Sequence, residues 1–260
     1  MVGGEVGYRE SLRAEAEEFA QASANSQAGP RKLAGALHEV RAAENDTEWL
    51  VSWRLETHRV FGYASDSAAY GALWFPAWHA LLNAPPMVQA LARQRVARPA
   101  RRATVVGSAL GEQCLFAVAM GWHCVGHELL CSSMVDRATA IVERHGLGDW
   151  AHFLCEPVSN LSHTALLVVN DLSWPERVRR EIEELAQRQL PEGGLYVSYR
   201  PPLGPAAASA AEGPWALKPL EGMEGARVRT SWSAGQAVHV SIRAPRRAGA
   251  GAGAGGKREL

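Results

Sequence analysis

The chain of 260 residues is 47% hydrophobic and 21% charged, an ordinary globular composition at a length that suits one α/β domain. Its 27 basic and 27 acidic side chains cancel, so the overall charge gives no signal for a nucleic-acid or membrane partner. The N-terminus lacks a signal-peptide core and no apolar run approaches the roughly 20 residues of a membrane span, so we expect a soluble intracellular protein, cytoplasmic or nuclear.

Residues 1–65 are predicted to form a helical extension of three helices. The first covers about residues 8–24, is rich in Ala and Glu, and ends before a break at Gly29-Pro30. The second carries Leu33, Leu37 and Val40 at the spacing of an amphipathic helix. The third begins near Asp46 or Thr47, both good N-caps, and turns its tryptophans inward.

From residue 102 the pattern changes to strands that alternate with helices. Five strands are predicted, at residues 103–106, 122–125, 153–154, 165–169 and 195–199. Residues 165–169 form a continuous apolar run, typical of a strand buried on both faces. The alternation predicts a mostly parallel, doubly wound sheet of the α/β, Rossmann-like class.

The chain after the fifth strand is predicted to form a Pro-rich loop and then an antiparallel hairpin. Residues 228–232 and 237–242 alternate with period two around Gly235, which places the hairpin at the edge of the sheet. We therefore assign residues 66–243 to one Rossmann-like domain. Residues 244–260 are rich in Ala and Gly and are expected to be a disordered tail.

A glycine turn joins the first strand to its helix, and an acidic residue follows the second strand. Gly107 permits a tight turn, and Gly111 is expected to let the backbone approach a ligand closely. The following helix presents free N–H groups. Glu128 lies about 20 residues beyond the turn, where a carboxylate can accept hydrogen bonds from the ribose of an adenosine-containing cofactor.

The segment Val105-Val-Gly-Ser-Ala-Leu-Gly111 resembles the D-x-G-x-G-x-G turn of the class I S-adenosylmethionine-dependent methyltransferases. Val105 replaces the usual acidic residue, which removes a contact to the methionine end of the cofactor, and Ala109 replaces the middle glycine. The resemblance covers about residues 66–243 and implies that the cofactor is S-adenosylmethionine. The implied cofactor-binding residues are Gly107, Ser108, Ala109, Gly111, Gln113, Glu128, Glu156 and Asn170.

A narrower resemblance concerns the non-SET histone lysine methyltransferases, the disruptor-of-telomeric-silencing family. Residues 170–174, Asn-Asp-Leu-Ser-Trp, are similar to its N-N-F-x-F segment, with Asp171 in place of the second asparagine. Residues 65–71, which end in Tyr70-Gly71, are similar to its Y-G-E segment, with Ala72 in place of the glutamate. This resemblance implies that Asn170, Trp174 and Tyr70 act at the methyl-transfer site.

Each of these residues also has a structural interpretation. Asn170 would orient the nucleophile or cap the helix that begins near Pro175. Trp174 would line the acceptor channel or simply pack, and Tyr70 would cover the cofactor or pack the N-terminal helices. Glu156 would contact adenine or remain a solvated loop residue.

The sequence therefore predicts a methyltransferase whose acceptor is unidentified, either a protein lysine or a small molecule. Two alternatives remain: a methyltransferase fold that serves as a scaffold without catalysis, and an NAD-dependent oxidoreductase. Ala109 and Glu112 stand at the second and third glycine positions of the dinucleotide motif, which disfavours NAD. The histidines and the four cysteines show no ligand spacing, so no metal is expected, and the cysteines are expected to be buried and unbridged.

Overall fold

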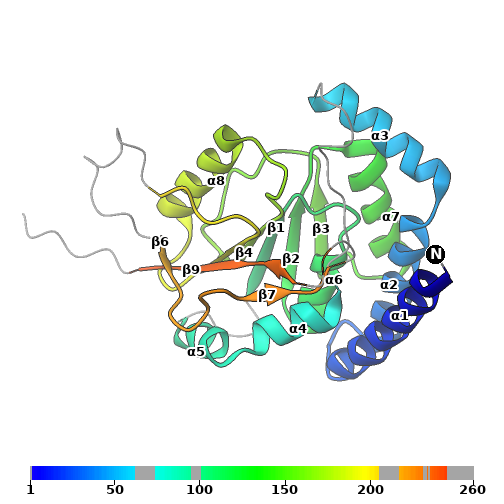
Figure 1. Cartoon of the computed structure of the whole chain (residues 1–260), viewed down its shortest axis with the longest axis horizontal. Helices are drawn as coiled ribbons and strands as arrows, with labels where there is room; N and C mark the ends of the chain where they lie inside the picture. The colour runs from blue at the N-terminus through cyan, green and yellow to red at the C-terminus, as the bar shows by residue number, and fades with distance from the viewer. Residues whose placement is uncertain are drawn as a thin grey trace, which may run out of the picture.

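The computed structural model describes residues 2–61, 74–94, 101–204, 217–230, 233 and 235–244. Seven strands form one sheet in the order β3-β2-β1-β4-β5-β9-β6 (Figure 1). Strands β1 to β5 are parallel, β9 runs antiparallel to β5, and β6 pairs antiparallel with β9. The strand bounds are Arg102–Val106 for β1, His123–His127 for β2, Ala151–Leu154 for β3, Thr164–Val169 for β4, Leu195–Ser198 for β5, Leu217–Pro219 for β6 and His239–Arg243 for β9.

The predicted doubly wound sheet is confirmed, because helices cover both of its faces. Eight α-helices and a short π-helix occur in the described residues. They are α1 (Val2–Ser23), α2 (Pro30–Glu44), α3 (Thr47–Phe61), α4 (Phe75–Asn83), α5 (Pro85–Arg93), α6 (Glu112–Ala119), the π-helix η3 (Cys131–Val135), α7 (Asp136–Arg144) and α8 (Glu176–Gln189).

The two faces of the sheet are covered unequally. Helix α6 packs on β1 and β2 and is itself covered by α1, α2 and α4, so that every one of its eight residues is buried. The opposite face carries α8, which packs on Leu167, Val169 and Tyr196 (Figure 1). The connection from β3 to β4, residues 155–163, contains no helix. The core is therefore thicker on the face of the N-terminal helices.

The N-terminal helices share the core of the sheet rather than standing apart from it. Phe19 of α1 packs against Phe75 of α4 and Phe116 of α6, with ring centroids 4.9 and 6.0 Å apart. The hydroxyl of Ser26 donates to the carbonyl of Val118 over 3.0 Å. The segment expected as an extension thus contributes to the same hydrophobic cluster as β1 and β4.

The predicted antiparallel hairpin is present, but its pairing differs from the expectation. Strands β7 (Arg227–Val228) and β8 (Gln236–Ala237) form a separate two-stranded ladder. Strand β9 then enters the main sheet between β5 and β6, so β6 and not the hairpin occupies that edge. Residues 231 and 232 of the predicted hairpin and residues 245–260 of the predicted tail lie outside the described residues.

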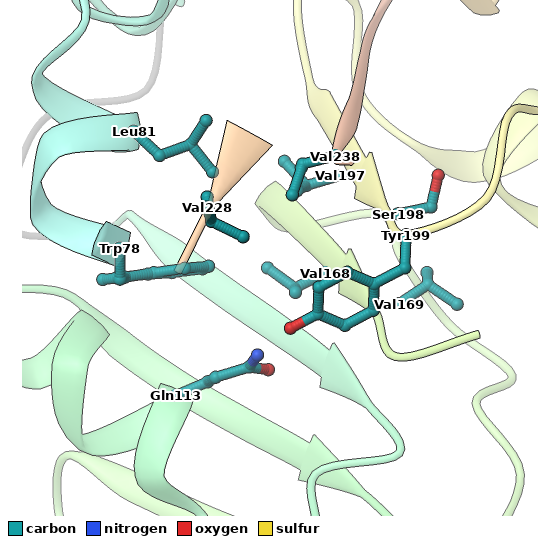
Figure 2. A pocket seen from close by; sticks show the side chains of 10 residues that line it. All are labelled: Trp78, Leu81, Gln113, Val168, Val169, Val197, Ser198, Tyr199, Val228 and Val238. Carbon is teal, nitrogen blue, oxygen red and sulfur yellow. The ribbon is translucent and has the colours of Figure 1, made fainter. Parts of the chain in front are cut away.

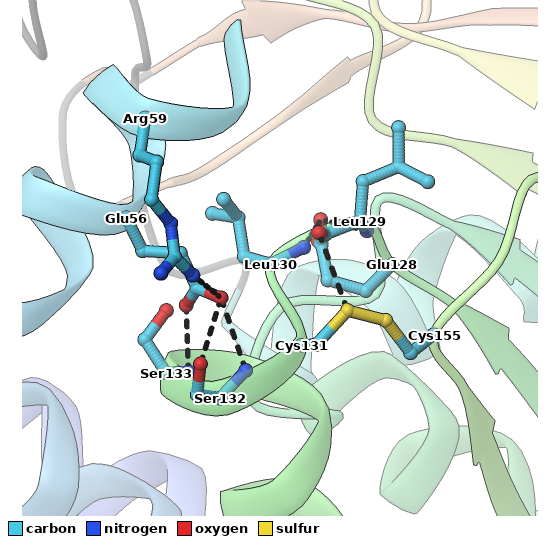
Figure 3. The surroundings of a disulfide bond; sticks show 9 residues. All are labelled: Glu56, Arg59, Glu128, Leu129, Leu130, Cys131, Ser132, Ser133 and Cys155. Atoms are coloured by element: carbon cyan, nitrogen blue, oxygen red, sulfur yellow. Dashed lines mark hydrogen bonds and ion pairs between the residues drawn. A yellow bond between two sulfur atoms is a disulfide. The ribbon is translucent and has the colours of Figure 1, made fainter.

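The expectation of unbridged cysteines was wrong. Cys114 of α6 is bonded to Cys124 of β2, and Cys131 of η3 is bonded to Cys155, which follows β3 (Figure 3). The Cα atoms of the two pairs lie 5.3 and 5.2 Å apart, within the usual disulfide range. The pairs come together through the β1–β2–β3 topology, which the spacing of the cysteines in the sequence does not reveal. None of the helices in the described residues has the length and apolarity to cross a bilayer.

Candidate functional site

A groove of about 590 Å³ lies at the carboxyl ends of β1, β2 and β4. The groove lies between the neighbouring parallel strands β1 and β4, where the strand order changes direction. Strand β1 is followed by α6 on one face of the sheet, and β4 is followed by α8 on the other face. Ligands of doubly wound sheets bind at this switch point. The groove reaches from Trp53 and Phe61 of α3 to Ile182 and Leu185 of α8.

Most of the predicted site residues line this groove. These are Gly107, Ala109, Gln113, Glu128, Glu156, Asn170 and Trp174. Ser108 belongs to the turn and is buried, and neither it nor Gly111 lines the groove. Tyr70 and the rest of residues 65–71 lie outside the described residues, so the position of Tyr70 stays a prediction.

The turn after β1 is held against the end of β2. The N–H groups of Gly107 and Ser108 both donate to the carbonyl of His127, over 2.9 and 3.2 Å. Gly107 and Gly111 have φ of 73° and 88°, and Ala109, at 49°, is the one non-glycine residue with positive φ among those described. Glycine adopts this left-handed backbone without strain, whereas Ala109 adopts it at a cost in conformational energy.

The glycines are also required by the side chains that pack on the turn. A Cβ atom on Gly107 would lie 2.7 Å from the ring of Trp174, and one on Gly111 would overlap the ring of Phe153. The space above Gly111 is thus filled by Phe153. Gly111 therefore has a packing role, and its expected part in close approach of a ligand stays a prediction.

Glu128 joins the turn to the end of β2. Its carboxylate accepts hydrogen bonds from the N–H groups of Ala109, Leu129 and Leu130, over 3.2, 2.7 and 3.3 Å. Burial raises the pKa of Glu128, and these three donors oppose that rise. The carboxylate is therefore fixed at the groove by backbone donors that also orient it.

The segment after β2 is anchored from two sides, as Figure 3 shows. The disulfide between Cys131 and Cys155 ties it to the residues after β3, next to the exposed Glu156. From α3, the buried carboxylate of Glu56 accepts hydrogen bonds from the N–H groups of Ser132 and Ser133, over 3.1 and 2.7 Å. Glu56 was not predicted as a site residue. It is 76 residues away from Ser132 in the sequence, and only the fold brings the two together.

Asn170, at the end of β4, forms a reciprocal pair with Gln113 of α6. Its Nδ2 donates to the carbonyl of Gly107 over 2.7 Å and to Oε1 of Gln113 over 2.9 Å. Nε2 of Gln113 donates back to Oδ1 of Asn170 over 3.1 Å. Asn170 does not cap α8, whose N-cap is Pro175 without a side-chain hydrogen bond. The pair ties β4, the turn and α6 together.

Asp171, next to Asn170, has a structural role. It is fully buried, and its carboxylate accepts from Nε of Arg179 over 2.8 Å and from the N–H groups of Tyr199 and Arg200. It therefore joins the ends of β4 and β5 to α8. Trp174 covers Gly107 and also lines the groove, so it packs as expected, and its role at an acceptor channel stays a prediction.

Two further ionisable residues in the groove were not predicted as site residues. Tyr199 follows β5, and Figure 2 shows its hydroxyl pointing toward the space between Trp78 and Gln113. Burial raises the pKa of Tyr199. Glu112, the first residue of α6, is buried and lines the groove. It stood in the glycine motif of the sequence, where it was interpreted only as a departure from the dinucleotide pattern.

No protein-family model and no curated protein sequence matches the chain. Among solved structures, the chain is similar to an S-adenosylmethionine-dependent methyltransferase from Geobacter sulfurreducens in complex with S-adenosyl-L-homocysteine, at 22% identity and a TM-score of 0.33. That alignment covers 44% of this chain and 47% of the Geobacter chain, so it spans about half the length of that protein.

Two other solved structures show likeness of the same degree. An RNA methyltransferase from Salinibacter ruber in complex with S-adenosyl-L-homocysteine is 18% identical, with 64% of this chain and 97% of that chain covered and a TM-score of 0.38. A methyltransferase from Thiobacillus denitrificans is 22% identical, with 50% and 55% covered and a TM-score of 0.33. The fold assignment rests on the strand order described above. The narrower resemblance to the non-SET histone lysine methyltransferases gains no support from these structures.

Proposed function

We propose that the groove binds S-adenosylmethionine and that the chain transfers its methyl group to an acceptor. The observation that carries the proposal is the position of Glu128. Its carboxylate lies at the end of β2, is oriented by the N–H of Ala109 in the turn, and faces the same groove as Asn170 at the end of β4. A carboxylate in this position is suited to accept hydrogen bonds from the two ribose hydroxyls of adenosine.

The polar groups of the groove fit the rest of this cofactor. Leu129, Pro157 and Val158 supply apolar surface beside Glu128, which suits an adenine ring. Gln113 in the first turn of α6, Asn170 at the end of β4 and Tyr199 after β5 supply polar atoms. The groove thus offers a carboxylate, an apolar wall and a polar end in the arrangement that an elongated nucleoside ligand needs.

The bound cofactor would supply an electrophilic methyl group on a positively charged sulfur. The contribution of the protein is to orient the acceptor and exclude water. The Asn170–Gln113 pair holds two amide groups at fixed positions in the groove, and the ring of Trp174 closes the space over Gly107. The acceptor we propose is a protein lysine or a small molecule with a nucleophilic atom.

Calorimetric titration of the purified chain with S-adenosylhomocysteine and with NAD separates the proposal from the oxidoreductase alternative. We expect saturable binding of S-adenosylhomocysteine and none of NAD. Binding of NAD alone would overturn the proposal. Tritium transfer from labelled cofactor to a cell extract, with and without prior protease digestion, then distinguishes a protein acceptor from a small one. Binding of the cofactor without transfer of the labelled methyl group to protein or to small molecules would favour the scaffold alternative.

A further inference from the structure

Glu112 presents a buried carboxylate to the groove. Its side chain belongs to the first turn of α6, and the residue is 5% exposed. Its Oε2 atom has no hydrogen-bond partner among the described residues, although Glu112 lines the groove. Buried carboxylates are nearly always paired in proteins, so this oxygen indicates a missing cationic or hydrogen-bond-donating partner.

The nearby cation is already bound by other carboxylates. Arg41 of α2 is buried and donates to both carboxylate oxygens of Glu15, over 2.9 and 2.7 Å. It also donates to both oxygens of Glu44, over 2.8 and 2.9 Å. Arg41 is thus held by Glu15 and Glu44, and Glu112, whose pKa responds to the charges of these three residues, is the acid of this cluster that lines the groove.

Glu112 and Glu128 both line the groove beside the turn formed by residues 107–111. Glu128 faces the carboxyl end of β2, and Glu112 begins the helix that follows the turn. A ligand whose ribose is bound by Glu128 and which extends along the turn meets Glu112 with its far end. In S-adenosylmethionine that end carries an α-ammonium group. Val105 stands where the class I methyltransferases that the turn resembles have an acidic residue. Its side chain is buried in the core and carries no charge.

We propose that Glu112 is the carboxylate that binds the α-ammonium group of the cofactor's methionine moiety, in place of the acid that is absent at position 105. The assignment rests on the proposed function. It supplies the partner that the Oε2 atom lacks, and it places a positive charge beside a cluster of acids. It also makes the amino group, in addition to the nucleoside, a determinant of ligand affinity.

The protonation of Glu112 gives a second observable. Burial, reinforced by the charge of Glu44 and opposed by Arg41, raises the pKa of Glu112 to about 8, and Glu15 and Tyr199 also face it. A bound ammonium favours the ionised carboxylate, so ligand binding must release a proton. At pH 8 roughly half a proton should be released for each ligand bound.

The test compares S-adenosylhomocysteine with a desamino analogue in which hydrogen replaces the α-amino group. Affinities are measured by calorimetry for the wild-type chain, for Glu112→Gln, and for the control Glu181→Gln. Glu181 lines the same groove on α8 but is largely exposed and pairs with Arg177, so its replacement removes the same charge without touching the cluster.

We expect the wild type and Glu181→Gln to bind the desamino analogue roughly 10- to 100-fold more weakly than S-adenosylhomocysteine. In Glu112→Gln this difference should vanish, through loss of affinity for S-adenosylhomocysteine alone. Wild-type titrations at pH 8 in two buffers of different ionisation enthalpy should show proton release with S-adenosylhomocysteine and not with the analogue. This readout does not depend on how the variant folds.

A Glu112→Gln protein that still discriminates between the two ligands would overturn the assignment, as would a wild type that releases no proton. A variant effect on S-adenosylmethionine but not on S-adenosylhomocysteine would overturn it too, because it would place the sulfonium and not the ammonium beside Glu112. A wild type that binds neither ligand would instead overturn the proposed function, and the assignment with it.

Discussion

Replacing Gly111 with alanine tests whether Phe153 makes glycine necessary in the turn. Gly111 has φ of 88°, and a Cβ atom there would overlap the ring of Phe153. Gly121 is a matched control, since its φ is 82° and a Cβ atom would meet nothing within 4 Å among the described residues. Both substitutions impose the same backbone strain, and only Gly111→Ala adds the overlap.

The expected magnitudes follow from these two contributions. A left-handed alanine costs roughly 1–2 kcal/mol, of which about 0.4–1 kcal/mol is offset by reduced freedom in the unfolded chain. Forcing a methyl group into packed space adds about 1–3 kcal/mol. Gly111→Ala should therefore lower the free energy of unfolding by about 1–3 kcal/mol more than Gly121→Ala. In the double variant Gly111→Ala/Phe153→Ala the overlap is removed, so the combined loss should fall short of the sum by a similar amount.

Urea unfolding, followed by tryptophan fluorescence, measures these differences. Equal losses for Gly111→Ala and Gly121→Ala would refute the packing role of Phe153. So would strict additivity of Gly111→Ala and Phe153→Ala. Retained binding of S-adenosylhomocysteine by a folded Gly111→Ala protein would agree with the structure, because Gly111 does not line the groove.

Glu128→Ala should weaken the binding of S-adenosylhomocysteine by about 1–3 kcal/mol in calorimetry, because the ribose and the N–H of Ala109 both lose their acceptor; unchanged affinity would place the ribose elsewhere. Arg179→Met leaves the buried carboxylate of Asp171 without its cation and should cost about 3–5 kcal/mol in urea unfolding. Adding Asp171→Asn should recover part of that loss, and no recovery would contradict the pairing. The pKa of Glu112 is raised from 4.5 to about 8, so the folded chain retains a proton there that the unfolded chain releases. This stabilisation is fully present below pH 4.5 and is lost as the pH rises through 8. In thermal melts, Glu112→Gln should therefore gain stability relative to wild type between pH 5 and 9. A difference in melting temperature between the two proteins that stays constant with pH would refute the raised pKa of Glu112.

The parts of the fold that were predicted correctly depend on local pattern. The apolar run at residues 165–169 matches β4, and the glycines at 107 and 111 mark the turn between β1 and α6. The spacing from this turn to Glu128 reflects one helix and one strand, so it places that residue at the end of β2. Period, turn chemistry and spacing are properties of short segments, and they can be read without knowing what packs on them.

The features that were missed depend on distant partners. Cys131 and Cys155 meet because β2 and β3 are neighbours, and the hairpin gives way to β9 because β5 offers a free edge. Glu112 looks like an ordinary N-terminal helix residue until α1 and α2 cover it. Phe153, which belongs to a weakly predicted strand, packs on Gly111 and gives this glycine a packing role that the sequence does not reveal. Burial and pairing of this kind are decided by the assembled layers.

The covering of α6 by the N-terminal helices has a consequence for synthesis on the ribosome. Helices α1 and α2 emerge before α6, and the surface they bury, including Phe116 and Val118, is translated some 90 residues after Ser26. Their apolar faces must stay exposed while the turn, α6 and β2 are added, because contacts of long sequence separation form late. The nascent chain therefore presents Phe19, Leu33 and Leu37 to solvent until α6 has been translated, and a chaperone that binds short apolar segments would find a target there.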